Sequence, residues 1–222
     1  MQTAPGVFIS FEGPDGSGKS TQIELLAAAL AARGYEVVTT FEPGGTSIGR
    51  RIREIILDNK SAGMCGITEF LLYAADRAQD VYEMIRPAIA AGKIVLGDRF
   101  VDSSIAYQGH GLGMDMNAVL SANAIATGGL LPDLTLVLDI DAAEGVARAI
   151  GRSECDRIEA RKLEFHERVR RAYHNIAAEQ PTRVRVLDVA GKNIGMVHEE
   201  ICAEVLAFLE VRRREAPCDA GS

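Results

Sequence analysis

The most restrictive feature of this 222-residue sequence is a regular alternation between short apolar segments and longer segments with helical periodicity. Runs rich in β-branched or aromatic residues predict five strands, over 7–11, 36–40, 93–97, 134–140 and 184–189. Apolar residues spaced three and four positions apart predict helices over 21–33, 48–57, 67–91, 117–127, 142–150, 158–178 and 194–213. This alternation predicts an α/β fold, in which a five-stranded parallel sheet carries helices on both faces.

The length and charge of the chain limit the classes of protein to which it can belong. We expect a single domain over 1–213, followed by a small, polar and disordered tail over 214–222. The net charge of -7 argues against a nucleic-acid partner, because proteins that bind duplexes usually carry a basic face. An acidic chain can still bind an anion through a few local positive groups.

The cysteines and the apolar runs indicate the cellular compartment. The four cysteines form no Cys-x-x-Cys pair and are irregularly spaced: Cys65, Cys155, Cys202 and Cys218. This spacing argues against a zinc site or a disulfide framework and favours free thiols in a reducing cytosol. The N-terminus has no signal-peptide pattern, and the first apolar run is too short to span a membrane. We therefore expect a cytoplasmic protein without a membrane partner.

A phosphate-binding motif follows the first predicted strand. The residues from Gly13 to Ser20 match G-x-x-x-x-G-K-[ST], between a strand and an amphipathic helix. In such a loop the glycines let consecutive backbone N–H groups face an anion, and the helix N-terminus adds its positive dipole end. Lys19 can reach the β- and γ-phosphates of a nucleotide, and the hydroxyl of Ser20 can hold Mg²⁺. The motif predicts binding of ATP and Mg²⁺.

A second pair of charged residues follows the third predicted strand. Asp98 and Arg99 come directly after 93–97, at the edge of the sheet where ligands bind. An acid in this position can order Mg²⁺ and its waters. The guanidinium of Arg99 can hold a phosphate with two parallel hydrogen bonds.

Other features narrow the class of P-loop protein. Asn59-Lys60 begins like the N-K-x-D guanine-binding motif of switch GTPases, but the acid is missing and the position is too early in the chain. The length leaves no room for the added domains of motor or helicase ATPases. A small kinase is the favoured interpretation. A kinase for dUMP, CMP, GMP or another monophosphate, and a non-catalytic ATP-sensing module, stay open as alternatives.

Five sequence blocks together resemble the thymidylate kinases, in their bacterial form, from Val7 to about Leu209. In chain order the blocks are Gly13–Thr21, Glu42–Thr46, Ala74–Gln79, Asp98–Gly109 and Asp156–Glu159. The resemblance implies the P-loop nucleoside-monophosphate-kinase fold, with a short lid over about 148–159. It also implies ATP-dependent phosphorylation of dTMP to dTDP in dTTP biosynthesis, by in-line transfer of the γ-phosphoryl group.

The resemblance further implies which residues bind each nucleotide. ATP would contact the P-loop and the lid through Gly13, Pro14, Asp15, Gly16, Ser17, Gly18, Lys19, Ser20, Thr21 and Arg148. The acceptor would contact Asp15, Glu42, Pro43, Tyr73, Arg77, Arg99, Ser103, Ser104, Tyr107 and Gln108. Ser20 and Asp98 would hold Mg²⁺.

Four of these positions have more specific implied roles. Tyr73 would stack on thymine, and Arg77 would donate to the pyrimidine O4, which favours thymine over cytosine. Arg99 would hold the 5′-phosphate of the acceptor. The ring of Tyr107 would crowd the 2′ position and so exclude a ribose hydroxyl, which is specificity by steric exclusion.

The lid is expected to supply a catalytic arginine. Some members of the family carry an arginine at the P-loop position that is Gly16 here, so the lid must provide it in this chain. Among Arg148, Arg152 and Arg157 we predict that Arg152 acts on the transferring group, and that Lys19, Arg99 and Arg152 are the catalytic residues. No general base is required, because the acceptor phosphate is already anionic at neutral pH.

Three positions depart from the family pattern. Phe41 stands where an arginine is common, Arg50 where an acid is frequent, and Asp80 where histidine is frequent. None of these changes removes a group that is assigned to the chemistry.

The family resemblance implies a homodimer, with the predicted helix over 67–91 as a candidate interface.

Overall fold

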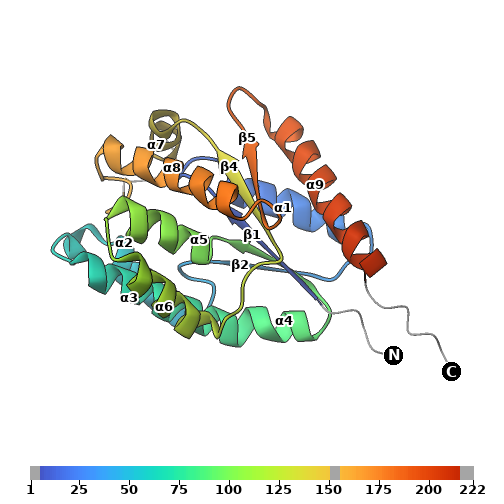
Figure 1. Cartoon of the computed structure of the whole chain (residues 1–222), viewed down its shortest axis with the longest axis horizontal. Coiled ribbons are helices and arrows are strands. Elements are labelled where there is room, and N and C mark those ends of the chain that lie inside the picture. The colour runs from blue at the N-terminus through green and yellow to red at the C-terminus, as the bar shows by residue number, and fades with distance from the viewer. Residues whose placement is uncertain (1–5, 151–155, 216–222) are drawn as a thin grey trace.

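The described part of the chain, residues 6–150 and 156–215 of a computed structural model, contains one parallel sheet. Its strand order is β2-β3-β1-β4-β5, and each neighbouring pair runs parallel (Figure 1). The strands are β1 (Val7–Glu12), β2 (Val37–Phe41), β3 (Ile94–Asp98), β4 (Leu134–Asp139) and β5 (Val184–Asp188). The predicted α/β fold with five parallel strands is confirmed.

Helices connect the strands, mostly within a few residues of the predicted ranges. The first half of the chain has α1 (Lys19–Ala31), α2 (Ser47–Leu57), η1 (Asn59–Ser61), α3 (Gly66–Asp80), η2 (Val81–Ile85) and α4 (Arg86–Ala90). The second half has α5 (Val101–Ser104), η3 (Ile105–Gly111), α6 (Met116–Thr127), α7 (Ala142–Ile150), α8 (Leu163–Glu179) and α9 (Ile194–Glu215). Helix α9 runs two residues beyond the predicted end of the domain. The rest of the predicted tail, 216–222, lies outside the described residues.

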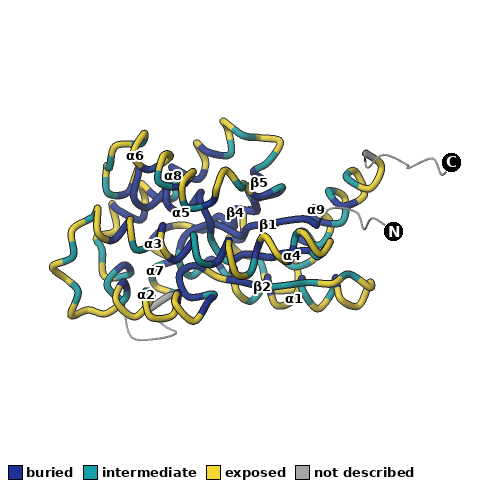
Figure 2. Tube along the Cα trace, turned by 90° about the horizontal axis from the view of Figure 1, so that it is seen from below, coloured by how far each residue is buried: buried dark blue, intermediate teal, exposed yellow. Residues whose placement is uncertain are grey.

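The two faces of β1 show why the helices form two layers. Val7, Ile9 and Phe11 pack into a core cluster with α1 and α9 on one face of the sheet. Phe8 points to the opposite face, where it packs with residues of η2, α4 and α5. Each fully buried side chain of this size contributes on the order of 1.5–3 kcal/mol. Buried residues therefore follow the central strands, and exposed residues lie mainly on the outer helices (Figure 2).

The register of the sheet brings the charged strand ends together. Asp98 pairs with Phe11 on one side and with Phe41 on the other. The residues that follow these strands, Gly13, Glu42 and Arg99, therefore start from the same edge. In a parallel sheet this carboxyl edge is the position where ligands bind.

The segment over 67–91 was predicted as one helix that bends near Pro87, and the structure confirms a continuous helical run with a local irregularity. A π-turn, η2, joins α3 to α4. The N–H of Arg86 donates to the carbonyl of Val81, five residues earlier. Pro87 has no N–H to continue the regular ladder, so the irregularity falls in the turn before it.

The predicted start of the helix over 158–178 is wrong, because α8 begins only at Leu163. The carboxylate of Asp156 accepts hydrogen bonds from the N–H groups of Ile158 and Glu159, at 2.8 and 2.9 Å. This side-chain turn competes with a helix at the same residues. The chain then extends at Lys162 before the helix starts.

The described residues bear on two further expectations. Cys65 and Cys202 have free thiols, whereas Cys155 and Cys218 lie outside the described ranges. No helix within 6–150 and 156–215 combines the length and the apolar character needed to cross a membrane.

Candidate functional site

The P-loop turns sharply between β1 and α1, and three of its positions require glycine. Gly13, Gly16 and Gly18 have φ angles of 128°, 75° and 95°, a region that side chains disfavour. A Cβ on Gly16 would lie only 2.1 Å from the carbonyl oxygen of Gly145 on α7. The loop and the first turns of α7 are therefore in backbone contact, which leaves no space for a side chain at position 16.

Lys19 is held along the inside of this loop. Its Nζ donates to the carbonyl oxygens of Gly13 and Pro14, at 3.1 and 2.9 Å. Burial, followed by the charge of Arg99, lowers the pKa of Lys19 to about 8. A buried ammonium whose partners are mainly neutral carbonyls is well placed to bind an incoming anion.

Ser20 and Asp98, which are both predicted to hold Mg²⁺, meet at the start of α1. The hydroxyl of Ser20 donates to Oδ2 of Asp98 at 2.6 Å. Both groups offer oxygen atoms, which are the ligands that Mg²⁺ prefers. No group of three or more His, Cys, Asp or Glu residues in the described ranges could hold a metal by itself. The pair fits an ion that is held mostly by nucleotide phosphates and water.

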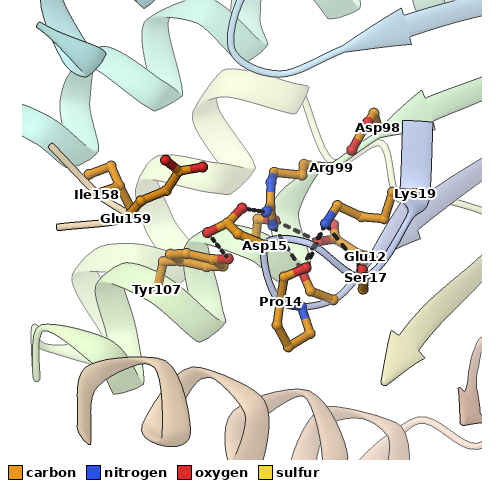
Figure 3. A network of polar contacts seen from close by, with 12 residues as sticks. Glu12, Pro14, Asp15, Ser17, Lys19, Asp98, Arg99, Tyr107, Ile158 and Glu159 are labelled. Carbon is orange, nitrogen blue, oxygen red and sulfur yellow. Dashed lines mark hydrogen bonds and ion pairs between the residues drawn. The ribbon is translucent and has the colours of Figure 1, made fainter. Parts of the chain in front are cut away.

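Arg99 occupies the centre of the site (Figure 3). Its guanidinium forms an ion pair with Asp15, donates to the carbonyl of Gly13 at 3.1 Å and lies over the ring of Tyr107. The φ angle of Arg99 is 74°, and it is the one non-glycine residue with positive φ in the described ranges. Such strain costs about 1–3 kcal/mol and persists only where surrounding contacts enforce it.

Asp15 connects Arg99 to Tyr107. The hydroxyl of Tyr107 donates to Oδ2 of Asp15 at 3.1 Å. Burial works against ionisation of Asp15, but the charges of Arg99 and Lys19 lower its pKa below the usual value. The carboxylate therefore stays ionised between the P-loop and Arg99.

All ten residues predicted to contact the acceptor line a single cleft: Asp15, Glu42, Pro43, Tyr73, Arg77, Arg99, Ser103, Ser104, Tyr107 and Gln108. Their roles toward a ligand stay predictions. The same cleft is also lined by Asp156 and Ile158, which belong to the fifth sequence block, and by Arg53 and Leu57, which the sequence did not single out. Arg53 follows the helical pattern of α2, so nothing in its local sequence distinguishes it from a surface charge.

A second cleft adjoins the first along the P-loop. Lys19, Ser20 and Asp98 line it, together with Gly16 and Gly18. The two clefts share four lining residues: Asp15, Glu42, Arg53 and Arg99. Five of the ten residues predicted to contact ATP therefore border a depression that is continuous with the acceptor cleft: Asp15, Gly16, Gly18, Lys19 and Ser20. The other five line neither cleft: Gly13, Pro14, Ser17, Thr21 and Arg148.

Arg77 is a buried centre of hydrogen bonds at the inner end of the acceptor cleft. Its side chain is 1% exposed and forms an ion pair with Glu42 at 2.7 Å. It also donates to Ser104 at 2.9 Å, to Asn123 at 2.6 Å and to the carbonyl of Phe100 at 3.0 Å. These contacts fix the guanidinium in the wall of the cleft and engage its N–H groups with protein acceptors.

Three buried carboxyl groups surround this arginine. Glu42, Asp76 and Asp80 each have one oxygen without a hydrogen-bond partner in the described residues. Burial raises the pKa of all three, to about 6 for Asp76 and to about 7 for Asp80. Asp80 departs from the family pattern, so this chain carries an additional acid here.

We predict that Asp80→Asn stabilises the protein more at pH 8 than at pH 5. An aspartate in the unfolded chain titrates near 3.9. Because the folded-state pKa is higher, at about 7, the stability falls as pH rises between these values, and the full penalty is present above pH 7. The amide removes the charge, and its oxygen can still accept from Thr40 Oγ1, which lies 2.6 Å from Oδ1.

Urea unfolding should show a gain of about 1–2 kcal/mol for Asp80→Asn at pH 8 and little change at pH 5. Glu210→Gln, on the exposed side of α9, serves as a control and should change stability by less than about 0.5 kcal/mol. An equal effect of Asp80→Asn at both pH values would contradict the prediction.

Two of the three arginines of the predicted lid belong to the described residues, and they lie in different places. Arg148 lies beside the P-loop, with its Cβ 3.1 Å from a Cβ built on Gly16, and its side chain pairs with Glu144. Arg157 forms an ion pair with buried Glu69 at 2.7 Å and donates to the carbonyl of Ile56 at 2.8 Å. Arg152, predicted as the catalytic arginine, lies outside the described residues.

Glu12 is a charged residue of the site that the sequence did not indicate. It is fully buried at the end of β1, directly before the P-loop. Its hydrogen-bond partners lie 88 to 161 residues later in the chain. No local pattern could reveal them.

Comparison with known proteins agrees with this geometry. Residues 11–201 match the family model described as thymidylate kinase. A thymidylate kinase of Exiguobacterium sibiricum is 50% identical over 209 residues, which cover 94% of this chain and 98% of that protein. A second, from Halothermothrix orenii, is 50% identical over 207 residues, which cover 92% and 98%.

A solved structure shows the same relation in three dimensions. The crystal structure of thymidylate kinase from Ehrlichia chaffeensis matches with a TM-score of 0.74 and 35% identity, over 92% of this chain and 99% of that one. The match of the family model and the identity over nearly the whole length settle the classification: this chain belongs to the thymidylate kinase family.

Proposed function

We propose that this protein transfers the γ-phosphoryl group of ATP to dTMP and so forms dTDP. The observation that carries the proposal is the pair of joined clefts. One cleft contains Lys19 and Ser20 of the P-loop, the other contains Arg77 and Tyr107, and Arg99 lines both. This arrangement lets the terminal phosphate of a donor approach the phosphate of an acceptor in line.

The chemistry needs positioning and charge neutralisation more than proton transfer. The second pKa of a phosphate monoester is about 6, so the attacking oxygen is already anionic at pH 7. Lys19 would bind the donor phosphates, and Arg99 would bind the acceptor phosphate. Ser20 and Asp98 would hold Mg²⁺, which neutralises charge between the donor phosphates. Arg152 remains our choice for the arginine on the transferring group.

The shape of the acceptor cleft supports a pyrimidine deoxynucleotide. Tyr73 offers a flat face for stacking, which any base can use. Arg77 lines the same cleft. A hydrogen bond from Arg77 to the O4 carbonyl would favour thymine over cytosine, and it would replace one of the contacts that the guanidinium makes with protein acceptors. Tyr107, which is 7% exposed and bonded to Asp15, cannot easily move away from a 2′-hydroxyl.

A panel of acceptors tests the proposal. The purified protein is incubated with ATP, Mg²⁺ and each of dTMP, dUMP, dCMP, dGMP, dAMP and their ribose forms, and ADP release is followed. Strong turnover with dTMP, weak turnover with dUMP and little with the others is expected. Turnover with a different monophosphate would overturn the acceptor assignment. ATP binding without any turnover would favour the sensing-module alternative.

The protein is also proposed to form a homodimer through the helices at the end of the molecule that is remote from α9. Helices α3 and α6 are in contact and carry exposed apolar side chains: Ile67, Leu71, Leu120 and Ile125. Leu71 and Ile125 are 54% and 84% exposed. Apolar residues that gather in this way on a surface favour contact with another protein surface.

We predict that the double change Leu71→Glu and Leu120→Glu yields a monomer, because it would bury charges in the interface. Light scattering after size exclusion should give twice 23.8 kDa for the wild type and 23.8 kDa for the variant. Val211→Glu changes an equally exposed apolar residue on α9 and should keep the larger mass. A wild-type mass of one chain would contradict the dimer.

A further inference from the structure

The Glu12 carboxylate lies beneath Arg99 and is hydrogen-bonded on both of its oxygens. Oε1 accepts from the N–H of Phe100 at 2.7 Å. Oε2 accepts from the hydroxyls of Ser103 and Tyr173, at 2.6 and 2.9 Å. The side chain is completely buried, so these three donors take the place of water.

The partners of Glu12 are the groups that surround Arg99. Phe100 is the next residue, and its N–H is fixed just where the backbone of Arg99 adopts positive φ. The oxygens of Ser103 and Tyr173 lie 3.3 and 3.5 Å from Nη1 of Arg99. Carboxylate and guanidinium therefore share two hydroxyls, one from α5 and one from α8.

The direction of these hydrogen bonds follows from the chemistry of a carboxylate. An ionised carboxylate only accepts, so when Glu12 is ionised the hydroxyls of Ser103 and Tyr173 donate to it and not to each other across the 3.0 Å between them. The hydroxyl oxygens of Ser103 and Tyr173 are then left to accept from Arg99. An amide at position 12 would present N–H groups to the hydroxyls, and their protons would be free to turn toward the guanidinium.

We infer that Glu12 is a positioning residue, which holds Arg99 in the orientation that binds the 5′-phosphate of the acceptor. The inference rests on the proposed function only for the identity of the ligand. The contacts between Glu12 and the surroundings of Arg99 belong to the protein itself. Glu12 can act only through its neighbours, because it is completely buried and lines neither of the two clefts.

Burial makes the ionised form of Glu12 energetically unfavourable, and a group that is retained at such a cost in free energy is consistent with a functional role for its charge. Burial, followed by the charge of Asp102, raises its pKa to about 7. The Ser103 hydroxyl, the charge of Arg99 and the Tyr173 hydroxyl oppose that rise. An apolar residue would avoid this cost, but it could not orient the two hydroxyls.

Glu12→Gln tests the inference, because it keeps the shape of the side chain and removes its charge. Titration calorimetry should show dTMP binding about 10- to 100-fold weaker, since a misplaced positioning group has effects of this order. The Kd for ATP should stay within about threefold, because the P-loop donors are unchanged. A kcat measured at saturating dTMP should fall less than kcat/KM.

Asp102→Asn is the matched control. Asp102 is equally buried, but both of its oxygens bind Arg183, at 2.7 Å each, and it has no contact with Arg99 among those found in the described residues. Its loss should lower the Tm. Both Kd values should stay within about threefold, because removing the charge of Asp102 lowers the pKa of Glu12 and so keeps Glu12 ionised. If Glu12→Gln does not fold, Tyr173→Phe provides the second variant, with dTMP binding expected to weaken about three- to tenfold.

A signal from Arg99 itself separates the inference from the proposed function. The Nε–Hε resonance of Arg99, assigned by its loss in Arg99→Lys, should shift and broaden in Glu12→Gln without any ligand. An unchanged Arg99 resonance in Glu12→Gln would overturn the role of Glu12. If the wild type binds dTMP, an equal dTMP affinity of Glu12→Gln would overturn it as well. If the wild type binds no dTMP, the proposed function is wrong. The Arg99 resonance then tests the positioning role of Glu12 by itself, because that measurement uses no ligand.

Discussion

Replacing Lys19 with alanine is expected to lower kcat by about 10³-fold while the protein stays folded. Its ammonium lies inside the P-loop, 2.9 Å from the Pro14 carbonyl, where the donor phosphates would bind. In this water-poor position one missing charge removes stabilisation that water cannot replace. Steady-state assays with saturating ATP and dTMP measure the effect.

The stability of the Lys19→Ala protein should be equal to that of the wild type or higher. The pKa of Lys19 is lowered to about 8, so the folded state holds this proton less tightly than the unfolded chain does. Between pH 8 and about 10.5 the wild type therefore gains stability as pH rises, and below pH 8 the buried charge is a cost. Removing the charge relieves that cost.

Lys192→Ala provides the control for a lysine outside the site. Lys192 forms an ion pair with Glu200 on α9, at 2.7 Å. This change should leave kcat within about twofold, because exposed ion pairs contribute little. Near-normal turnover in Lys19→Ala would show that the P-loop lysine does not act on the donor.

The sequence predicted those features that are encoded over short stretches. Four of the five residues from Val7 to Phe11 are apolar, with apolar side chains on both faces, and such a run predicts a strand of a parallel sheet that is covered on both sides. The P-loop depends on three glycines and a lysine within eight positions, so its motif is local as well. The ten predicted residues of the acceptor cleft come from four separate segments, and only the family resemblance brought them together.

The helical segment over 101–111 was not predicted, and its burial explains why. Val101 to Ser104 are all buried, as are Ala106 to Gly109. A helix that is enclosed on nearly all sides needs no polar face, so the apolar periodicity of surface helices is absent. The π-turn of η3 and two glycines weaken the pattern further.

Glu12 and Arg77 could not be predicted as buried from sequence, for a related reason. A charged side chain at the end of a strand or on a helix usually faces water. Each is buried because several partners from distant parts of the chain satisfy it, as Ser104 and Asn123 do for Arg77. Such partners are brought together only by the complete fold.

Arg99→Lys should show that the shape of this cation matters as well as its charge. The planar guanidinium binds Asp15 and the Gly13 carbonyl at the same time and leaves its flat side against Tyr107. A lysine keeps the charge but lacks the fork that holds a phosphate with two parallel hydrogen bonds. Both residues lack the freedom of glycine at φ 74°, so the backbone strain is the same in each.

We expect the KM for dTMP to rise about 10²-fold in Arg99→Lys and kcat to fall as well, since the acceptor phosphate is no longer held in line. The KM for ATP should stay within about threefold, because Lys19 and the loop N–H groups bind the donor. Arg170→Lys is the matched control: the Arg170 fork binds both oxygens of Asp139 at 2.8 Å, away from either cleft. If the two variants have the same kinetics, a positive charge at position 99 is sufficient, and the acceptor phosphate is held by other donors such as Arg53.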